Sequence, residues 1–422
     1  MPGFALLAFS VWAASGRITF AQEAPAAKPD TVKLSKSASD SSALLQQSQL
    51  EKELEAALSA EKKSTSSSPA QTSPQTSTSA GRPSSSLNPA ISVIGTLLGT
   101  AANADAFEKN INLGLQEAEF SFQAYVDPYA KADFYIAFGR HGGNPLVAEA
   151  EEGHGGFEPA LEEAYLSTLA LPYALKVKAG VFRSAFGKLN LSHPHAHPFA
   201  DAPRAYANFL GDEGLADTGV SINWLVPNPF GYFQELTFEF ISGNTESPSF
   251  AKAIGNKFLY LGHLKNFFDL TENATLEVGL TGVVGPNDST GQITKLGGVD
   301  LTYKWKPLQR NRYRSFTLMA EALFNQRNEI GGNTVKSKGI YGFANYQIAK
   351  RWFLGGRYDY SEFPETGDRH DEMFSGVLAF YTSEFQKLEW QLSRIEPADE
   401  KSYMQILLRG VFVIGAHGAH EY

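Results

Sequence analysis

The most regular hydrophobic pattern in the chain lies between Glu162 and Phe186, on both sides of a short turn at Pro172-Tyr173. On the first side the apolar face comprises Ala164, Leu166 and Ala170, and the polar face comprises Glu163, Tyr165 and Ser167. On the second side the two faces comprise Leu175, Val177 and Ala179, and Lys176, Lys178 and Gly180. Alternation with a period of two predicts β-strands with one apolar and one polar face.

The same alternation recurs to the end of the chain and predicts sixteen strands. They are 91–99, 113–126, 131–139, 159–171, 174–183, 216–226, 232–243, 257–268, 273–284, 294–306, 313–325, 336–349, 352–361, 372–383, 385–395 and 402–414. Very short connections alternate with long polar ones, as in bacterial barrels that have short periplasmic turns and long outer loops. An even strand number places both ends in the periplasm, and this parity supports the first strand. The sequence predicts a transmembrane antiparallel β-barrel of about 16 strands.

The positions of the aromatic residues separate a membrane barrel from a soluble β-sandwich. They crowd against the short connections, at Tyr125, Tyr129, Tyr173, Trp224, Phe230, Tyr232, Phe233, Phe267, Phe268, Trp305, Trp352, Phe353, Tyr381 and Phe385. A periplasmic aromatic girdle explains this clustering, whereas a sandwich has no reason to gather aromatics at one end.

Composition narrows the function classes. The 422 residues include no cysteine, so thiolate metal sites and cysteine nucleophiles are excluded. The formal net charge of -9, without a basic patch, argues against a nucleic-acid partner. Ser184 or Ser192 beside His193 lacks a nucleophile-elbow pattern, so we expect no enzyme and no cofactor.

Three regions are predicted along the chain. Residues 1–21 read as a secretory signal peptide, and 22–88 as a low-complexity periplasmic arm, disordered or weakly coiled-coil. Heptad-like spacing gives a short coiled coil over 43–61, with a transient helix as the alternative. Residues 89–422 form the barrel in the Gram-negative outer membrane, in contact with its lipid.

The runs QEAEFSFQAYVDPYAKADFYIAFG and EEAYLSTLALPYALKVKAGVFRSAFG, and the ending GAHGAHEY, resemble Gram-negative outer-membrane porins related to the phosphate-selective porins O and P. Some members of this kind are linked to zinc regulation. The resemblance implies a passive, water-filled channel, a homotrimer, and small solutes or ions as cargo. The terminal aromatic resembles the signal that hands such barrels to the barrel-assembly machinery.

The face opposite the apolar one should line the pore. Its charged residues include Glu117, Glu119, Asp133, Glu163, Lys176, Lys178, Glu235, Glu239, Asp300 and Glu321, and also Glu277, Lys304, Arg357, Asp359, Glu389 and Arg409. Acids outnumber bases, which predicts a preference for cations. The alternative is an anion or phosphate channel whose constriction uses Lys176, Lys178, Arg183, Lys188 and Arg204. A structural barrel that tethers envelope layers through its arm is the alternative from another class.

The connection 184–215 is the longest of the outer ones. The resemblance to porins implies that this third outer loop folds inward and narrows the channel. It contains His193-Pro194-His195-Ala196-His197, read as an extended segment with the imidazoles on alternate residues. Imidazole is a preferred zinc ligand, and Asp201, Asp212 or Glu213 could complete a tetrahedral set. The sequence therefore predicts a weak Zn site of His193, His195, His197 and Asp201. The alternative is that these histidines pack the loop.

Overall fold

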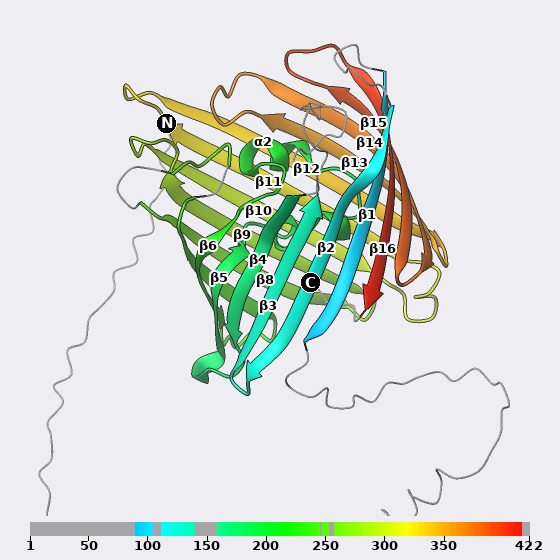
Figure 1. Cartoon of the computed structure of the whole chain (residues 1–422), viewed down its shortest axis with the longest axis horizontal. Helices are drawn as coiled ribbons and strands as arrows, with labels where there is room; N and C mark the ends of the chain where they lie inside the picture. Colours follow the sequence, from blue (N-terminus) through cyan, green and yellow to red (C-terminus); the bar gives the residue numbers. More distant parts are fainter. Residues whose placement is uncertain (1–88, 104–110, 140–157, 245–246, 253–256, 416–422) are drawn as a thin grey trace, which may run out of the picture. The chain divides into compact units, whose positions relative to one another are not determined.

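The computed structural model describes residues 89–103, 111–139, 158–244, 247–252 and 257–415. Its sixteen antiparallel strands form one closed barrel, in which each strand pairs with its sequence neighbours and β1 closes on β16 (Figure 1). The strands are β1 Ala90–Ala102, β2 Ile111–Asp127, β3 Ala130–Gly139, β4 Glu158–Thr168, β5 Leu175–Arg183, β6 Ala216–Leu225, β7 Phe233–Ile241, β8 Leu259–Thr271, β9 Ala274–Pro286, β10 Ile293–Trp305, β11 Phe316–Asn328, β12 Thr334–Ala349, β13 Trp352–Glu362, β14 His370–Ser383, β15 Gln386–Glu396 and β16 Tyr403–Gly415. The predicted fold class and strand number are confirmed.

The two faces of the barrel differ in polarity. In β15, Lys387, Glu389 and Gln391 point inward and are buried, whereas Trp390 and Leu392 between them are 38% and 50% exposed. The outward face carries large exposed apolar side chains on most strands, among them Phe134, Leu166, Phe238, Phe240, Tyr260, Leu280, Phe374 and Ile406. Such a surface suits lipid hydrocarbon on strands whose backbone groups are all paired in a closed sheet. Among the described residues, no helix has the length and apolarity needed to cross a membrane.

Two irregularities change which side chains point inward. Glu117 of β2 pairs with Thr96 while Leu115 pairs with Leu97, so Gln116 is an extra residue in that strand. In β4 the partners of Tyr135 and Ile136 are Glu163 and Leu161, which leaves Glu162 as the extra residue. These are β-bulges, which re-aim neighbouring side chains and often occur near functional sites.

The connection between β5 and β6 folds into the barrel, as the sequence predicted. It contains two short 3-10 turns, η2 Leu189–Leu191 and η3 Pro194–Ala196, and the helix α2 Arg204–Leu210. Helix α2 contacts β12 and β13 (Figure 1), and Ala205 packs on the inward face of Gly339. The main hydrophobic core therefore lies between this loop and the inner wall.

The predicted signal peptide 1–21, the arm 22–88 and its coiled coil 43–61 lie outside the described residues, so these domain assignments stay predictions. The same holds for the end of the chain beyond residue 415.

Candidate channel constriction at loop 184–215

The loop 184–215 buries an apolar face against one side of the barrel interior. Its fully buried side chains include Phe186, Leu189, Phe199, Phe209 and Leu210, and they pack with Ile241, Leu259, Val283, Leu323, Tyr341 and Phe343 of the strands. Burying a phenylalanine is worth about 1.5–3 kcal/mol, so this cluster holds the loop firmly. Because these strand residues face inward, the apolar face of the loop lies next to β7–β12.

Inward carboxylates of the strands accept hydrogen bonds from the backbone of the loop. Glu321 accepts from the N–H groups of Lys188 and Leu189 at 3.2 and 2.8 Å. Glu239 accepts from the N–H of Ala185 at 3.2 Å. An irregular loop inside a barrel needs such partners, since unpaired buried backbone groups are costly.

Basic side chains of the strands satisfy loop carbonyls in the same way. Arg409 donates to the carbonyl oxygens of Pro194 and His197 at 2.9 and 2.6 Å, and Lys387 donates to that of His197 at 3.0 Å. Arg409 and Lys387 also pair with Glu389 at 3.1 Å each. Many inward charges are therefore used to hold the loop in place.

His193 lies among three carboxylates near the bulges of β2 and β4. Its Nε2 is 2.8 Å from Glu163 Oε1, and its Nδ1 contacts Glu162 and lies 3.0 Å from Glu119 Oε2. Burial alone would lower the pKa of His193, but its hydrogen bonds to Glu119, Glu162 and Glu163 raise that pKa well above its ordinary value. The three carboxylates therefore favour the positively charged form of the imidazole.

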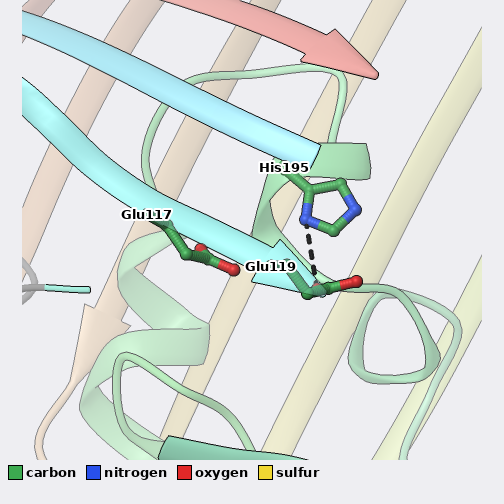
Figure 2. A group of neighbouring side chains, drawn as sticks. All are labelled: Glu117, Glu119 and His195. Carbon is green, nitrogen blue, oxygen red and sulfur yellow. Dashed lines mark ion pairs between the residues drawn. The ribbon is translucent and has the colours of Figure 1, made fainter. Parts of the chain in front are cut away.

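His195 faces a second group of acids on β2. Its Nδ1 is 3.5 Å from Glu119 Oε2. Figure 2 shows His195 pointing from the loop toward Glu119, with Glu117 beside it on the same strand. The potential ligand atoms of Glu117, Glu119 and His195 all lie within 4.8 Å of one another, and those of Glu119, Glu162 and His193 meet the same limit.

His197 and Asp201, the other two predicted metal ligands, lie elsewhere. His197 Nε2 bonds the carbonyl oxygen of Ser192 at 3.1 Å, and burial with the charges of Arg409 and Arg183 lowers its pKa to about 3. Asp201 binds Arg357 and Gln391, each at 2.7 Å. The expected extended conformation is wrong, because Pro194–Ala196 forms a 3-10 turn that sends His193 and His197 in different directions.

All ten predicted pore residues lie on the inward face, but the structure buries them unequally. Six are buried beneath or beside the loop: Glu119, Asp133, Glu163, Glu239, Asp300 and Glu321. Four are only partly buried: Glu117, Lys176, Lys178 and Glu235. Whether they line a conducting pore stays a prediction.

A cavity of about 290 Å³ opens between the loop and strands β2–β6 at the long-loop end of the barrel. Its charged lining residues are Glu117, Glu162, Arg183, Asp201, Asp212 and Glu213. A second, smaller cavity of about 140 Å³ is lined by His195, Lys387 and the turn residues Glu384 and Phe385 at the short-turn end. The group of Glu117, Glu119 and His195 thus lies between the two cavities.

Glu162 was missed in the sequence analysis. With Glu163 on the inward face, strict alternation assigns the adjacent Glu162 to the outer face of the barrel. The pair of adjacent acids could have revealed it. In a regular strand one of the two carboxylates would face lipid, which is unfavourable, so the pair indicates a β-bulge. Lys265 was also missed: it interacts electrostatically with the inward residues Asp300 and Lys304.

Solved structures similar to this barrel include a porin and an outer membrane channel. The anion-selective porin from Comamonas acidovorans is 12% identical and matches with a TM-score of 0.54, over 78% of this chain and 100% of the porin. Pseudomonas putida OprB is 11% identical, with a TM-score of 0.54 over 78% and 94% of the two chains. The outer membrane channel DcaP of Acinetobacter baumannii is also 11% identical, with a TM-score of 0.50 over 78% and 96%. The fold is therefore that of sixteen-stranded porins.

No model of a known protein family matches the sequence. Over 350 residues the chain is 30% identical to an uncharacterized protein of Aquifex aeolicus (strain VF5), covering 73% of this chain and 70% of that protein. The chain belongs to the same family as this Aquifex protein.

Proposed function

We propose that the chain is an integral outer-membrane channel for passive diffusion of small hydrophilic solutes, with loop 184–215 as its constriction. The observation that carries this proposal is a closed barrel with an apolar outer face, whose lumen is narrowed by a loop anchored to strands around the wall. Barrels of this size leave an aqueous passage unless it is plugged, and here cavities remain beside the loop.

We propose that the channel prefers cations, but for a reason other than the excess of acidic over basic residues on the inward face. Glu239 and Glu321 hold loop backbone groups and are buried, so they contribute little to the potential that a solute in the passage meets. The outer cavity, however, is lined by Glu117, Glu162, Asp212 and Glu213 against Arg183, and an excess of carboxylates attracts cations.

An anion channel is the second candidate, because lysines gather on the inward face toward the short-turn end. Lys176, Lys178 and Lys265 are only partly buried and Lys304 is exposed. This group of four lysines is not identical with the predicted anion constriction. Two members of that predicted set are already engaged: Arg183 binds the carbonyl oxygen of Glu213 at 2.7 Å, and Lys188 pairs with Glu277 at 2.9 Å. The phosphate-selective O and P resemblance belongs to this second candidate.

The test is the reversal potential of the purified protein in a planar bilayer under a KCl gradient. Cation preference supports the acidic entrance as the selective part, and anion preference assigns selectivity to the lysines. Absence of conductance would reject the channel and favour the envelope tether. In that case deletion of residues 22–88 should abolish its role, whereas a channel would still conduct without them.

Assembly as a homotrimer, insertion by the barrel-assembly machinery, and the absence of enzymatic activity are further parts of this proposal. They rest on the resemblance to porins and on the barrel architecture. Chemical cross-linking in detergent tests the trimer directly, since a monomeric product alone would reject it.

A further inference from the structure

We propose that Glu117, Glu119 and His195 bind a divalent first-row transition ion, such as Zn²⁺, which fastens the constriction loop to strand β2. The expected effect of the ion on conductance rests on the proposed function, since the ion would lie within the constriction of the channel. The ligand set differs from the one that the sequence predicted, because it keeps only His195 and takes both acids from the barrel wall.

The first argument is geometric. Glu117 and Glu119 are two residues apart on β2, so both side chains point inward, and His195 reaches them from η3 (Figure 2). The three potential ligand atoms lie within 4.8 Å of one another. Imidazole nitrogen and carboxylate oxygen are both zinc ligands, and zinc sites with three protein ligands keep a fourth position for water.

The second argument is that one oxygen of the buried Glu119 carboxylate lacks a hydrogen-bond donor. Glu119 is 1% exposed, and its Oε1 accepts no hydrogen bond within the described part of the chain. Its ion-pair contacts are to the ring nitrogens of His193 and His195, at 3.0 and 3.5 Å. Oε1 of Glu117 also lacks a donor there. Buried carboxylates are normally satisfied by hydrogen bonds or by a cation, and a bound ion would supply what is missing.

The third argument is charge. Glu117, Glu119, Glu162 and Glu163 meet here with His193 and His195. In this group the acidic side chains outnumber the imidazoles by four to two. Within the described ranges, neither Glu117 nor Glu119 has a lysine or arginine as ion-pair partner, whereas Lys178 interacts electrostatically with Glu163. A divalent cation balances this excess.

The fourth argument is access. Glu117 lines the cavity at the long-loop end, and His195 lines the cavity at the short-turn end. An ion could therefore enter from the outer side, and once bound it would lie between the two cavities. The expected consequence is that the ion reduces conductance.

Zn²⁺ binding is tested by isothermal titration calorimetry on the full chain refolded in detergent. Glu119→Gln keeps the size of the side chain and removes its charge, and Glu235→Gln is the matched control from another part of the inward face. Loss of a direct ligand should weaken Zn²⁺ binding by more than about tenfold, because replacing residues that only hydrogen-bond to the ligands already lowers metal affinity about tenfold or more. Glu235→Gln should bind as the wild type does.

Folding is checked for each variant by circular dichroism and by the heat-dependent gel shift of closed barrels. If Glu119→Gln does not fold, His195→Asn replaces it, since that residue belongs to the loop and not to the barrel wall. Mg²⁺ should bind far more weakly than Zn²⁺, because it prefers octahedral shells of oxygen ligands. Equal Zn²⁺ affinity in the folded wild type and variants, or no Zn²⁺ binding by the wild type, overturns the site.

Conductance in planar bilayers separates this site from the channel itself. Zn²⁺ should reduce the wild-type current, EDTA should restore it, and Glu119→Gln should conduct without this response. Conductance without Zn²⁺ binding rejects the metal site and leaves the channel standing. Calorimetric binding without any conductance supports the site and rejects the channel.

Discussion

Asp201 and Arg357, 156 residues apart in the chain, form an ion pair of 2.7 Å that ties the constriction loop to strand β13. Arg357 also donates to the carbonyl oxygen of Asp201 at 3.0 Å and pairs with Asp359 at 2.8 Å. Asp359 in turn accepts from the N–H of Arg204 at 3.0 Å, at the start of α2. One buried guanidinium thus fixes both the loop and its helix.

Replacing Arg357 by methionine should release this part of the loop. Asp201 and Asp359 would lose their cation, and breaking a buried ion pair costs about 3–5 kcal/mol. Because the barrel ladder does not depend on the pair, we expect a normal heat-dependent gel shift, higher single-channel conductance and faster proteolysis within 184–215. Arg310→Met, at an exposed turn, is the control, and unchanged conductance in Arg357→Met would contradict the anchoring role.

Acid should loosen the same contact. Burial raises the pKa of Asp201, but the Arg357 guanidinium and the Gln391 amide outweigh it and hold that pKa below the ordinary value of 3.8. The ion pair therefore contributes its full stabilisation above about pH 4, and the contribution is lost as the pH falls through the lower folded-state pKa.

We expect a change in conductance between pH 7 and pH 3 that is smaller in Asp201→Asn, because asparagine has no proton to gain. Bilayer recordings of both proteins at the two pH values make the comparison. An identical acid response in the two proteins would mean that other carboxylates control the loop.

Phe209→Ala should undock the loop from the apolar side of the lumen. Phe209 is fully buried and lies against Gly339 of β12, and such a truncation costs about 3–5 kcal/mol. Hydrogen exchange of backbone amides in 184–215 should accelerate, while exchange in the strands stays unchanged. Phe238→Ala, an outward-facing residue that is 49% exposed, should leave exchange in the loop as it is.

Neutralising the outer entrance should reduce cation preference. Asp212 and Glu213 are exposed at the outer cavity, so Asp212→Asn with Glu213→Gln removes two negative charges without disturbing the wall. The reversal potential under a KCl gradient should shift toward anions, and more strongly at low salt, where charges are less screened. Glu272→Gln, at the exposed β8–β9 turn, is the control; an equal shift in both proteins would show that the entrance charges do not select ions.

The barrel was predictable because each strand repeats the same physical rule. Alternation along residues such as Leu175, Lys176 and Val177 already separates the lipid face from the inner face, and short turns set the antiparallel order. Closure of β1 on β16 then follows from an even number of strands.

The constriction was predictable only in part, because its geometry depends on contacts that local patterns do not encode. The sequence placed the loop inside, but it could not show that Asp201 would meet Arg357 or that Glu321 would bind the loop backbone. The turn Pro194–Ala196 separates histidines that an extended segment would align. A bulge at Glu162 brings in an acid that strict alternation excludes.

The partners of the loop come from strands as far apart in the sequence as β4 and β16. The loop is synthesised before most of them, and contacts so distant in sequence form only after the intervening chain has been ordered. During biogenesis the loop would thus gain its last anchors only when β13, β15 and β16 supply Arg357, Lys387 and Arg409. The permeability of the finished protein is then a property of complete assembly, and a barrel that stalls before its final strands would leak.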